Sequence, residues 1–211
     1  QTNATITVDL VGNTTETVSA VLNSGAWTSL MIQPSGGSAR TITGAIAGHL
    51  IDLNGADNVM INGLNTGGNA LSISNTNTGT VSTIRFINTA SNNTITNCTV
   101  LGSSTDLTTG TILFSTVTSV GNSNNTISSC DIGPAGTNLP ANGIVSIGTA
   151  ANENANNTIQ NCNIFDFFSA TLISRGVFIS SNSNSWTISG NKFYQTNLRS
   201  YTGANTHRAI H

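Results

Sequence analysis

Three nearly identical phrases in this chain are separated by a constant interval. They read SNNTITNCTV (91–100), NSNNTISSCDI (122–132) and NANNTIQNCNI (154–164), and their cysteines, Cys98, Cys130 and Cys162, are evenly spaced. A fixed period of this size is typical of solenoids, in which each repeat buries its apolar face only against its neighbours. This interval constrains the fold more than any other feature of the sequence.

Five copies of the phrase can be aligned on their first isoleucine. Two further columns, three and five residues later, are mostly apolar, with polar residues between them. The three columns are Ile61, Ile95, Ile127, Ile159 and Ile188; Leu64, Cys98, Cys130, Cys162 and Asn191; and Thr66, Val100, Ile132, Ile164 and Phe193. Alternation of this kind indicates half-buried strands whose apolar side chains point inward.

The interval of three residues between the first two columns is odd. Odd intervals place side chains on opposite faces of a straight strand, so both point inward only if the chain bends between them. Glycine and asparagine adopt the left-handed backbone that such a bend favours. The position before the cysteine column is occupied by Gly63, Asn97, Ser129, Asn161 and Gly190. Each copy therefore predicts a strand, a corner and a second strand.

A glycine-led apolar segment adds a third strand to each repeat. It begins at Gly110, Gly143 and Gly176, and one more step of the same length leads to Ala209. We therefore predict an all-β fold, a right-handed parallel β-helix of about six coils, with three short strands in every coil of roughly 30–33 residues.

Asparagine and cysteine columns would run along the axis of this solenoid. Neighbouring coils stack at about 4.8 Å, so amide side chains in register can bond to one another as a ladder. We predict such ladders at Asn93, Asn125 and Asn157, and at Asn92, Asn124 and Asn156. The cysteines lack the close pairs of a zinc site, and we interpret Cys98, Cys130 and Cys162 as stacked interior thiols. A disulfide between neighbouring coils is the alternative.

We expect one domain, 1–211, with N-terminal coils and a cap in 1–60 and regular coils in 61–211. The amphipathic segment TETVSAVLNS (15–24) predicts a short capping helix, because solenoids need covered ends. The last residues, HRAIH (207–211), enter another glycine-led strand. This favours a fragment of a polypeptide that continues past His211, or end-to-end self-association of the chain.

Only 7% of the residues are charged, and the net charge is −2. With Lys192 as the single lysine, the chain lacks the clustered positive charge that nucleic-acid binding requires. It also lacks the run of about 18 apolar residues that a membrane-spanning helix needs. Gln1, without a basic region before it, is consistent with a mature N-terminus after signal-peptide removal. We therefore expect a secreted or cell-surface protein.

The organisation resembles the repeats of pectate-lyase-like right-handed β-helix proteins. More narrowly, residues 50–80, LIDLNGADNVMINGLNTGGNALSISNTNTGT, followed by NNTITNC, are similar to large secreted surface proteins of Bacteroidetes, many of them type IX secretion cargo. This resemblance implies that the coils form one section of a long extracellular polypeptide.

The residues expected on one surface predict a ligand-binding site. Phe165 and Tyr194 should point outward and stack on adjacent coils, with Asp166 and Lys192 nearby, as in a sugar-binding platform. Arg175 and Arg208 precede the glycine-led strand on adjacent coils and would hold an anionic sugar. A loop packed against the solenoid wall is the alternative interpretation of the aromatic residues.

We expect no catalytic residues, metal ligands or cofactors. The acidic residues fall in different columns and do not form the paired carboxylates of a polysaccharide lyase or hydrolase, which is the rival class. The prediction is a non-catalytic, extracellular structural or adhesive segment, able to form fibres and to meet a surface glycan. Ice binding is a minor alternative, based on the threonine column Thr94, Thr126, Thr158 and Thr187.

Overall fold

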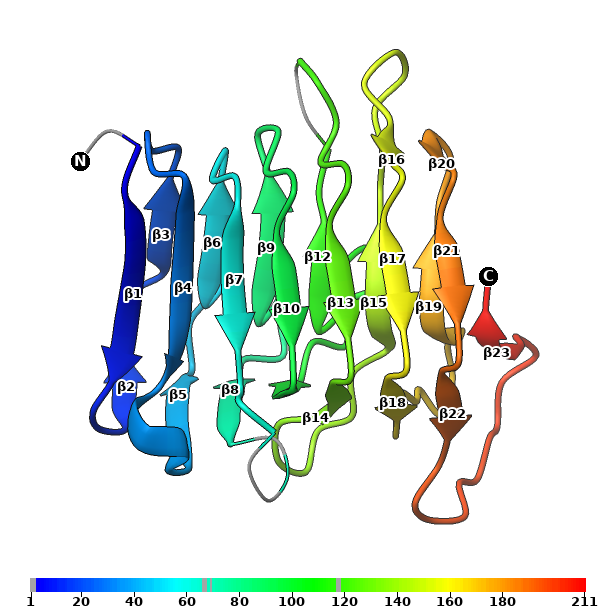
Figure 1. The fold of residues 1–211 in the computed structure, drawn as a ribbon. Coiled ribbons are helices and arrows are strands. Elements are labelled where there is room, and N and C mark those ends of the chain that lie inside the picture. The colour runs from blue at the N-terminus through cyan, green and yellow to red at the C-terminus, as the bar shows by residue number, and fades with distance from the viewer. Residues whose placement is uncertain (1–2, 66–67, 69, 117–118) are drawn as a thin grey trace.

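The structure is a computed structural model that describes residues 3–65, 68, 70–116 and 119–211. The chain winds into a right-handed parallel β-helix (Figure 1). In this view it descends along the near sheet, turns beneath and rises along the far sheet while it advances to the right. Three sheets of seven strands each run the length of the molecule and correspond to about six full turns, which confirms the predicted fold class.

Each coil contributes one strand to each sheet. Sheet A contains β1 (Thr5–Leu10), β4 (Ser29–Pro34), β7 (Val59–Asn62), β10 (Thr94–Thr96), β13 (Thr126–Ser128), β17 (Thr158–Gln160) and β21 (Thr187–Ser189). Sheet B contains β2 (Thr14–Glu16), β5 (Arg40–Gly44), β8 (Leu71–Asn75), β11 (Cys98–Gly102), β14 (Asp131–Pro134), β18 (Asn163–Phe165) and β22 (Lys192–Tyr194).

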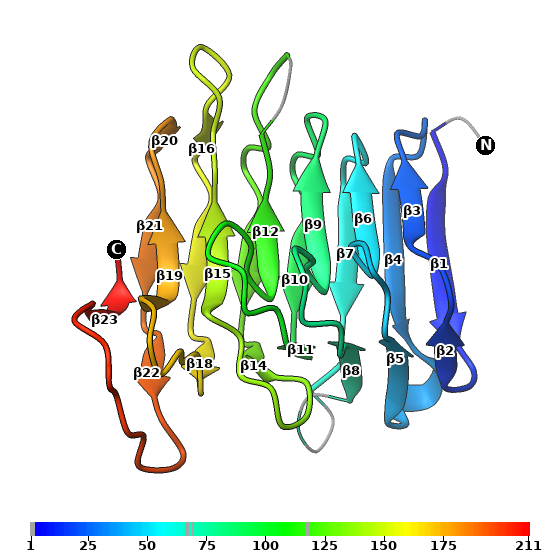
Figure 2. The same cartoon turned by 180° about the vertical axis from the view of Figure 1, so that it is seen from behind.

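Sheet C forms the third wall, seen from behind in Figure 2. It contains β3 (Ala20–Asn23), β6 (Ile51–Asn54), β9 (Ile84–Ile87), β12 (Ile112–Phe114), β15 (Asn142–Ser146), β19 (Ser174–Ile179) and β23 (His207–Ile210). A small additional sheet pairs β16 (Asn154–Ala155) with β20 (Ser183–Asn184).

The core is a stack of apolar layers between the three sheets. The predicted inward residues of the three cysteine-containing copies are all 0–1% exposed: Ile95, Cys98, Val100, Ile127, Cys130, Ile132, Ile159, Cys162 and Ile164. Sheet C closes each layer with its own column, in which Ile112, Ile144 and Val177 are fully buried. Each layer therefore packs mainly against the layers before and after it.

The predicted corner lies between sheets A and B. Asn97, Ser129 and Asn161 have φ angles of 54°, 52° and 55°, and Gly190 has a φ of 67°. Gly63 differs from this prediction, because the left-handed residue in its coil is Leu64, with a φ of 54°. A Cβ on Gly63 would lie only 1.7 Å from the carbonyl oxygen of the next coil's corner residue, so close backbone approach requires glycine here.

In one coil the predicted cysteine column has the wrong residue for the strand of sheet B. Cys98 pairs with Leu71, and Val100 with Ile73, so Leu64 does not belong to the cysteine column, and Thr66 lies outside the described residues. The segment after Leu64 is an insertion, and the strand of sheet B resumes beyond it. Repeat spacing alone does not reveal at which point such an insertion begins and ends.

The glycine column was also displaced by one residue in one coil. Ile112 pairs with Ile144, and Ile144 pairs with Val177, but the first of these two steps along the chain is shorter than the second. Gly110 therefore lies one position before the residue that faces Gly143. The local loop is one residue shorter than a uniform step assumes.

The predicted capping helix at 15–24 is wrong. This segment forms part of β2 and β3, which pair with β5 and β6. Parallel pairing with the next coil satisfies its backbone groups and overrides the amphipathic pattern, since local propensity is a weak determinant beside tertiary context. Among the described residues the helical segment is a single 3₁₀ turn, Ser35–Gly37.

Candidate functional site

Two stacked aromatic rings lie on the outer face of sheet B. Phe165 pairs directly with Tyr194, and their ring centroids are 5.6 Å apart with an interplanar angle of 16°. Gly133, one coil earlier, makes room for this stack, because a Cβ there would lie 2.4 Å from the Phe165 ring. Tyr194 is 43% exposed. These rings, here called the aromatic platform, offer a flat apolar face with a wet hydroxyl edge.

A polar column runs beside the aromatic platform. Asp131, Asn163 and Lys192 occupy equivalent positions on β14, β18 and β22. Asn163 donates a hydrogen bond from Nδ2 to Asp131 Oδ1 at 2.7 Å, and Lys192 is exposed. The platform is therefore flanked by a carboxylate, an amide and an ammonium group, which suit the hydroxyl groups of a sugar.

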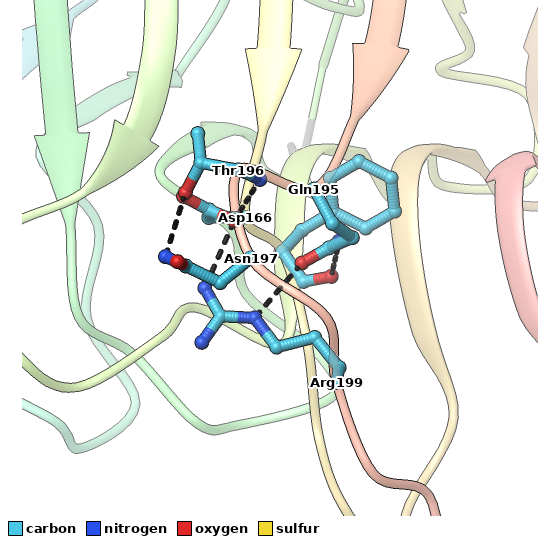
Figure 3. Close-up of polar contacts among 6 residues, drawn as sticks. Asp166, Gln195, Thr196, Asn197 and Arg199 are labelled. Atoms are coloured by element: carbon cyan, nitrogen blue, oxygen red, sulfur yellow. Dashed lines mark hydrogen bonds and ion pairs between the residues drawn. The ribbon is translucent and has the colours of Figure 1, made fainter.

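Asp166 follows the platform but is turned away from solvent. It is 5% exposed; its Oδ1 accepts from Thr196 N at 2.8 Å and from an Arg199 Nη at 2.9 Å, and its Oδ2 accepts from Thr196 Oγ1 at 2.5 Å. Figure 3 shows Arg199 reaching across to Asp166 and to Gln195, whose Oε1 accepts from Arg199 Nε at 3.3 Å. This carboxylate holds the loop 195–206 against the previous coil and is not part of the aromatic platform.

The pKa of Asp166 follows from the same contacts. Burial acts to raise this pKa, but the hydrogen bonds from Thr196 and then from Arg199 outweigh burial and lower the pKa below its ordinary value. A carboxylate held in its charged form by donors is suited to an anchoring role and unsuited to general acid catalysis.

The two arginines lie within the glycine-led strands β19 and β23 of sheet C, whereas the platform lies on sheet B. Arg175 pairs with Arg208 across β19 and β23. Arg175 is 9% exposed, its guanidinium carbon lies 4.1 Å from the Phe178 ring centroid, and its Nε donates to His211 Nδ1 at 3.1 Å. Burial, followed by the charge of Arg208, lowers the pKa of Arg175. Of the two arginines, the exposed Arg208 lines, together with Tyr194, a shallow hollow of about 250 Å³.

The other buried carboxylate is also held in an ion pair. Asp52 on β6 faces Arg85 on β9, whose Nε and one Nη bind its two oxygens at 2.9 and 2.5 Å. Next to this pair, burial and then the charge of Arg85 lower the pKa of His49 to about 4, although Asp52 acts in the opposite direction. His49 is therefore neutral near pH 7.

Asp106, a third acidic residue, is also held by hydrogen bonds. Asp106 accepts hydrogen bonds from Thr80 Oγ1 at 3.0 Å and from Thr108 N at 2.7 Å. Burial acts to raise its pKa, yet the bonds from Thr108 and Thr80 lower it. Within the described ranges, no group of three or more His, Cys, Asp or Glu side chains is arranged to hold a metal ion.

Asparagine side chains link consecutive coils inside the molecule. The Oδ1 atoms of Asn93, Asn125 and Asn157 accept from the backbone N–H groups of Val59, Asn93 and Asn125, at 2.8, 2.9 and 2.8 Å. Their Nδ2 atoms donate to carbonyl oxygens at the same edge of sheet A. The column therefore satisfies buried backbone groups at each turn without using a charge.

The neighbouring asparagine column has a backbone role instead of the predicted side-chain ladder. Asn92, Asn124 and Asn156 have φ angles of 58°, 60° and 56°. They form a left-handed corner at the entry to sheet A. Asparagine suits this position because it tolerates positive φ better than most residues.

The three cysteines form a buried column of thiols. Each Sγ donates to a carbonyl oxygen two residues before it, at 3.1–3.3 Å, and lies 3.6–3.7 Å from a carbonyl oxygen of the preceding coil. The hydrogen bond with Cys130, followed by burial, raises the pKa of Cys162 above its ordinary value. The thiols thus pack against backbone carbonyl groups, and in the described structure no disulfide joins the three cysteines.

Sequence reasoning missed a second set of buried asparagines. Asn122 and Asn154 form another linked pair, in which Asn122 N donates to Asn154 Oδ1 at 2.9 Å. Asn75 and Asn142 fasten loops, with Nδ2 bonds to Ser82 O at 3.3 Å and Thr109 O at 2.8 Å. The spacing of Asn122 and Asn154, which equals that of the cysteines, was a usable signal, whereas the other two follow no repeat.

The threonine column on the outer face of sheet A is in register. Thr94, Thr126, Thr158 and Thr187 pair in succession. The parallel outward column consists of Thr96, Ser128, Gln160 and Ser189, so the threonines form a single file. The two-wide threonine array on which the ice-binding alternative would depend does not form between these two columns.

No protein-family model, curated protein or solved structure matches the chain. Among the described residues, no helix has the length and apolar character needed to cross a membrane. The fold defines the chain as a parallel β-solenoid.

Proposed function

We propose that this chain is a non-catalytic structural and adhesive segment of a secreted or cell-surface protein. The observation that carries the proposal is the Asn93–Asn125–Asn157 column, in which each side chain fastens one coil to the next by hydrogen bonds. Such a column fixes the spacing of the coils along the axis. The result is a stiff rod whose stability depends little on salt, because few charges hold it together.

The state of the carboxylates supports a non-catalytic role. A general acid needs a pKa raised toward the working pH, whereas the pKa values of Asp106 and Asp166 are lowered by hydrogen bonds that outweigh burial. Both oxygens of Asp52 accept hydrogen bonds from the guanidinium group of Arg85. The acids with the most contacts thus fasten loops and strands.

Composition and resemblance support an extracellular location. The chain holds water mainly with hydroxyl and amide groups, since only 7% of its residues are charged. The resemblance to pectate-lyase-like coils and to long Bacteroidetes surface proteins, many of them exported by the type IX route, supports the same location.

Incubation with acidic glycans separates this proposal from an enzymatic one. The 211-residue chain is mixed with pectin, alginate and related polymers, and unsaturated ends and reducing sugars are measured. We expect no turnover. Turnover that is lost in Asp131→Asn or Asp166→Asn, while a Thr126→Ala control retains it, would establish a lyase or hydrolase instead.

The aromatic platform supports a second candidate, glycan binding. Phe165 and Tyr194 present stacked rings beside Asp131, Asn163 and Lys192. Tyr194→Ala removes the more exposed ring and should lower the affinity for a retained glycan by about tenfold or more, since aromatic anchors dominate such contacts. Equal retention of Tyr194→Ala and the Thr126→Ala control on a glycan array would place any binding elsewhere.

A further inference from the structure

A hollow of about 430 Å³ lies among loops that connect sheet B to sheet C in the interior coils of the rod. Two of these loops, 76–83 and 103–111, follow β8 and β11 on neighbouring coils, and the third, 166–173, follows β18. The lining combines threonine side chains with one carboxylate, Asp106, and two leucines. We propose that this hollow binds a sugar unit that carries hydroxyl or amine donors and no acidic group.

The threonine hydroxyls of the lining have already donated their protons. Thr80 Oγ1 donates to Asp106 Oδ2 at 3.0 Å, and Thr108 Oγ1 donates to Asp106 Oδ1 at 2.5 Å. Thr105 Oγ1 donates to Thr78 O at 3.2 Å. A hydroxyl group has one proton to donate and two lone pairs with which to accept. These three hydroxyls therefore offer acceptors to a ligand, and a ligand that binds them must supply the donors.

Asp106 gives the hollow its charge. Burial acts to raise the pKa of this carboxyl group, but the hydrogen bonds from Thr108 and Thr80 lower it, so the group is ionised near pH 7. The described lining residues include no lysine, arginine or histidine. An ionised carboxylate only accepts hydrogen bonds, and it repels a second negative charge. The hollow therefore favours neutral or amino sugars over uronic acids.

Two leucines supply the apolar part of the hollow. Leu107 is half-buried, and Leu172, which is 44% exposed, comes from a loop two coils further along the rod. Small-molecule sites combine apolar surface with a few placed polar groups, in volumes of about 300–1,000 Å³. The C–H face of a sugar ring matches the leucines, and its polar edge matches the acceptors. A single carboxylate suits such a ligand better than a calcium ion, which takes about six to eight oxygen ligands.

The acceptors are held in place by the surrounding structure. Asn142 on β15 is fully buried and donates from Nδ2 to the carbonyl oxygens of Leu107 and Thr109, at 3.3 and 2.8 Å. Ser104 Oγ donates to Gly79 O at 2.6 Å, which joins the two neighbouring loops. Because these loops are fixed by their own contacts, a ligand has little ordering to impose on them when it binds.

The test is a nuclear magnetic resonance titration of the whole chain with the methyl glycosides of glucosamine, glucose and glucuronic acid. The amide signals of Gly79 and Thr108 report on the hollow. We expect glucosamine and glucose to shift both signals, and glucuronic acid to bind at least about tenfold more weakly, since its charge would face Asp106. Tyr194→Ala, which alters only the aromatic platform, should leave these shifts unchanged.

Two variants remove the two halves of the hollow separately. Asp106→Asn should lower the affinity for glucosamine about tenfold, because hydrogen bonds to a charged group are lost, and should reduce the discrimination between glucose and glucuronic acid. That second readout would not change if the substitution only loosened the loops. Leu172→Ala takes part in none of the hydrogen bonds above and should weaken all three sugars about fivefold. Thr126→Ala, on the outer face of sheet A, is the control that should bind like the wild type.

Three results would overturn the proposal. They are unshifted Gly79 and Thr108 signals with every sugar, equal affinity of the wild-type chain for glucose and glucuronic acid, and wild-type affinities in Asp106→Asn and Leu172→Ala. The hollow extends the adhesive role proposed above. Its failure would leave the absence of turnover on acidic glycans untouched, whereas turnover there would refute the non-catalytic role and leave the hollow standing.

Discussion

Asn125 donates a hydrogen bond from Nδ2 to Asn157 Oδ1 at 3.1 Å, and the same oxygen accepts the backbone N–H of Asn125 at 2.8 Å. Two donors of Asn125, its side-chain amide and its backbone N–H, thus bind a single oxygen of the next coil. Both residues are fully buried. Since an unpaired buried polar group costs far more than a hydrogen bond gains, this pairing admits one register between the coils.

Loss of this contact should be costly. Asn125→Ala leaves the backbone N–H of Asn93 and the carbonyl of Ala90 without their partner. We expect the free energy of unfolding to fall by about 3 kcal/mol, since two buried backbone groups lose a hydrogen bond. Denaturant titration measures the change, with the outward-facing Thr126→Ala as the control at about 0.5 kcal/mol or less. Equal values for the two variants would show that the column contributes nothing.

The buried thiols should be inert. Cys98, Cys130 and Cys162 are 0–1% exposed, and the pKa of Cys162 is raised by its contact with Cys130 and by burial. Because the thiolate is the reactive form, a disulfide reagent at pH 8 should modify the native chain at least about a hundredfold more slowly than the unfolded chain. Rapid modification of the native chain at one thiol would contradict this packing.

His49 should make stability depend on pH. Its pKa is about 4 in the folded chain, below the ordinary value of 6.5, so between these values the unfolded chain binds a proton that the folded chain does not. The free energy of unfolding therefore falls as the pH falls from about 6.5 to about 4. After allowance for the partly exposed ring, we expect a loss of about 1–2 kcal/mol. In His49→Gln the same titration should be flatter, and an unchanged slope would assign the effect to another group.

The loop 195–206 should depend on Asp166. Asp166→Asn keeps the shape of the side chain but loses the charge that Thr196 and Arg199 bind. We expect limited proteolysis within this loop to accelerate about tenfold, because local opening becomes easier, with a smaller effect on global unfolding. Asp131→Asn, on the neighbouring column, is the matched control. If both variants are cut at the wild-type rate, Asp166 is not the anchor of the loop.

The repetitive part of this fold was predictable because each coil poses the same packing problem. The register of Ile95 with Ile127 and Ile159 follows from a constant interval and an alternating pattern, and the corner at Asn97 follows from an odd spacing that a straight strand cannot accommodate. The three cysteine-containing copies have the same spacing, so a wrong alignment of one copy would not match the other two.

Departures from the repeat were not predictable in the same way. The segment 15–24 is amphipathic when read alone, and only its pairing with Thr43 and Ile51 makes it part of strands β2 and β3. The outward stack of Phe165 on Tyr194 follows from register, but the burial of Asp166 and Arg175 depends on the loop 195–206 and on His211. Contacts between a loop and another coil leave no periodic trace in the sequence.

The central claim of this account is that neighbouring coils stack in direct register, with Thr126 on Thr158. Spin labels at these two outward positions measure the stacking directly by electron paramagnetic resonance. We expect strong dipolar broadening for this pair, since adjacent strands lie about 4.8 Å apart, and weaker broadening for labels at Thr94 and Thr158, two coils apart. A Thr126–Thr158 pair without broadening, in a chain that retains its β-sheet circular dichroism, would contradict the solenoid.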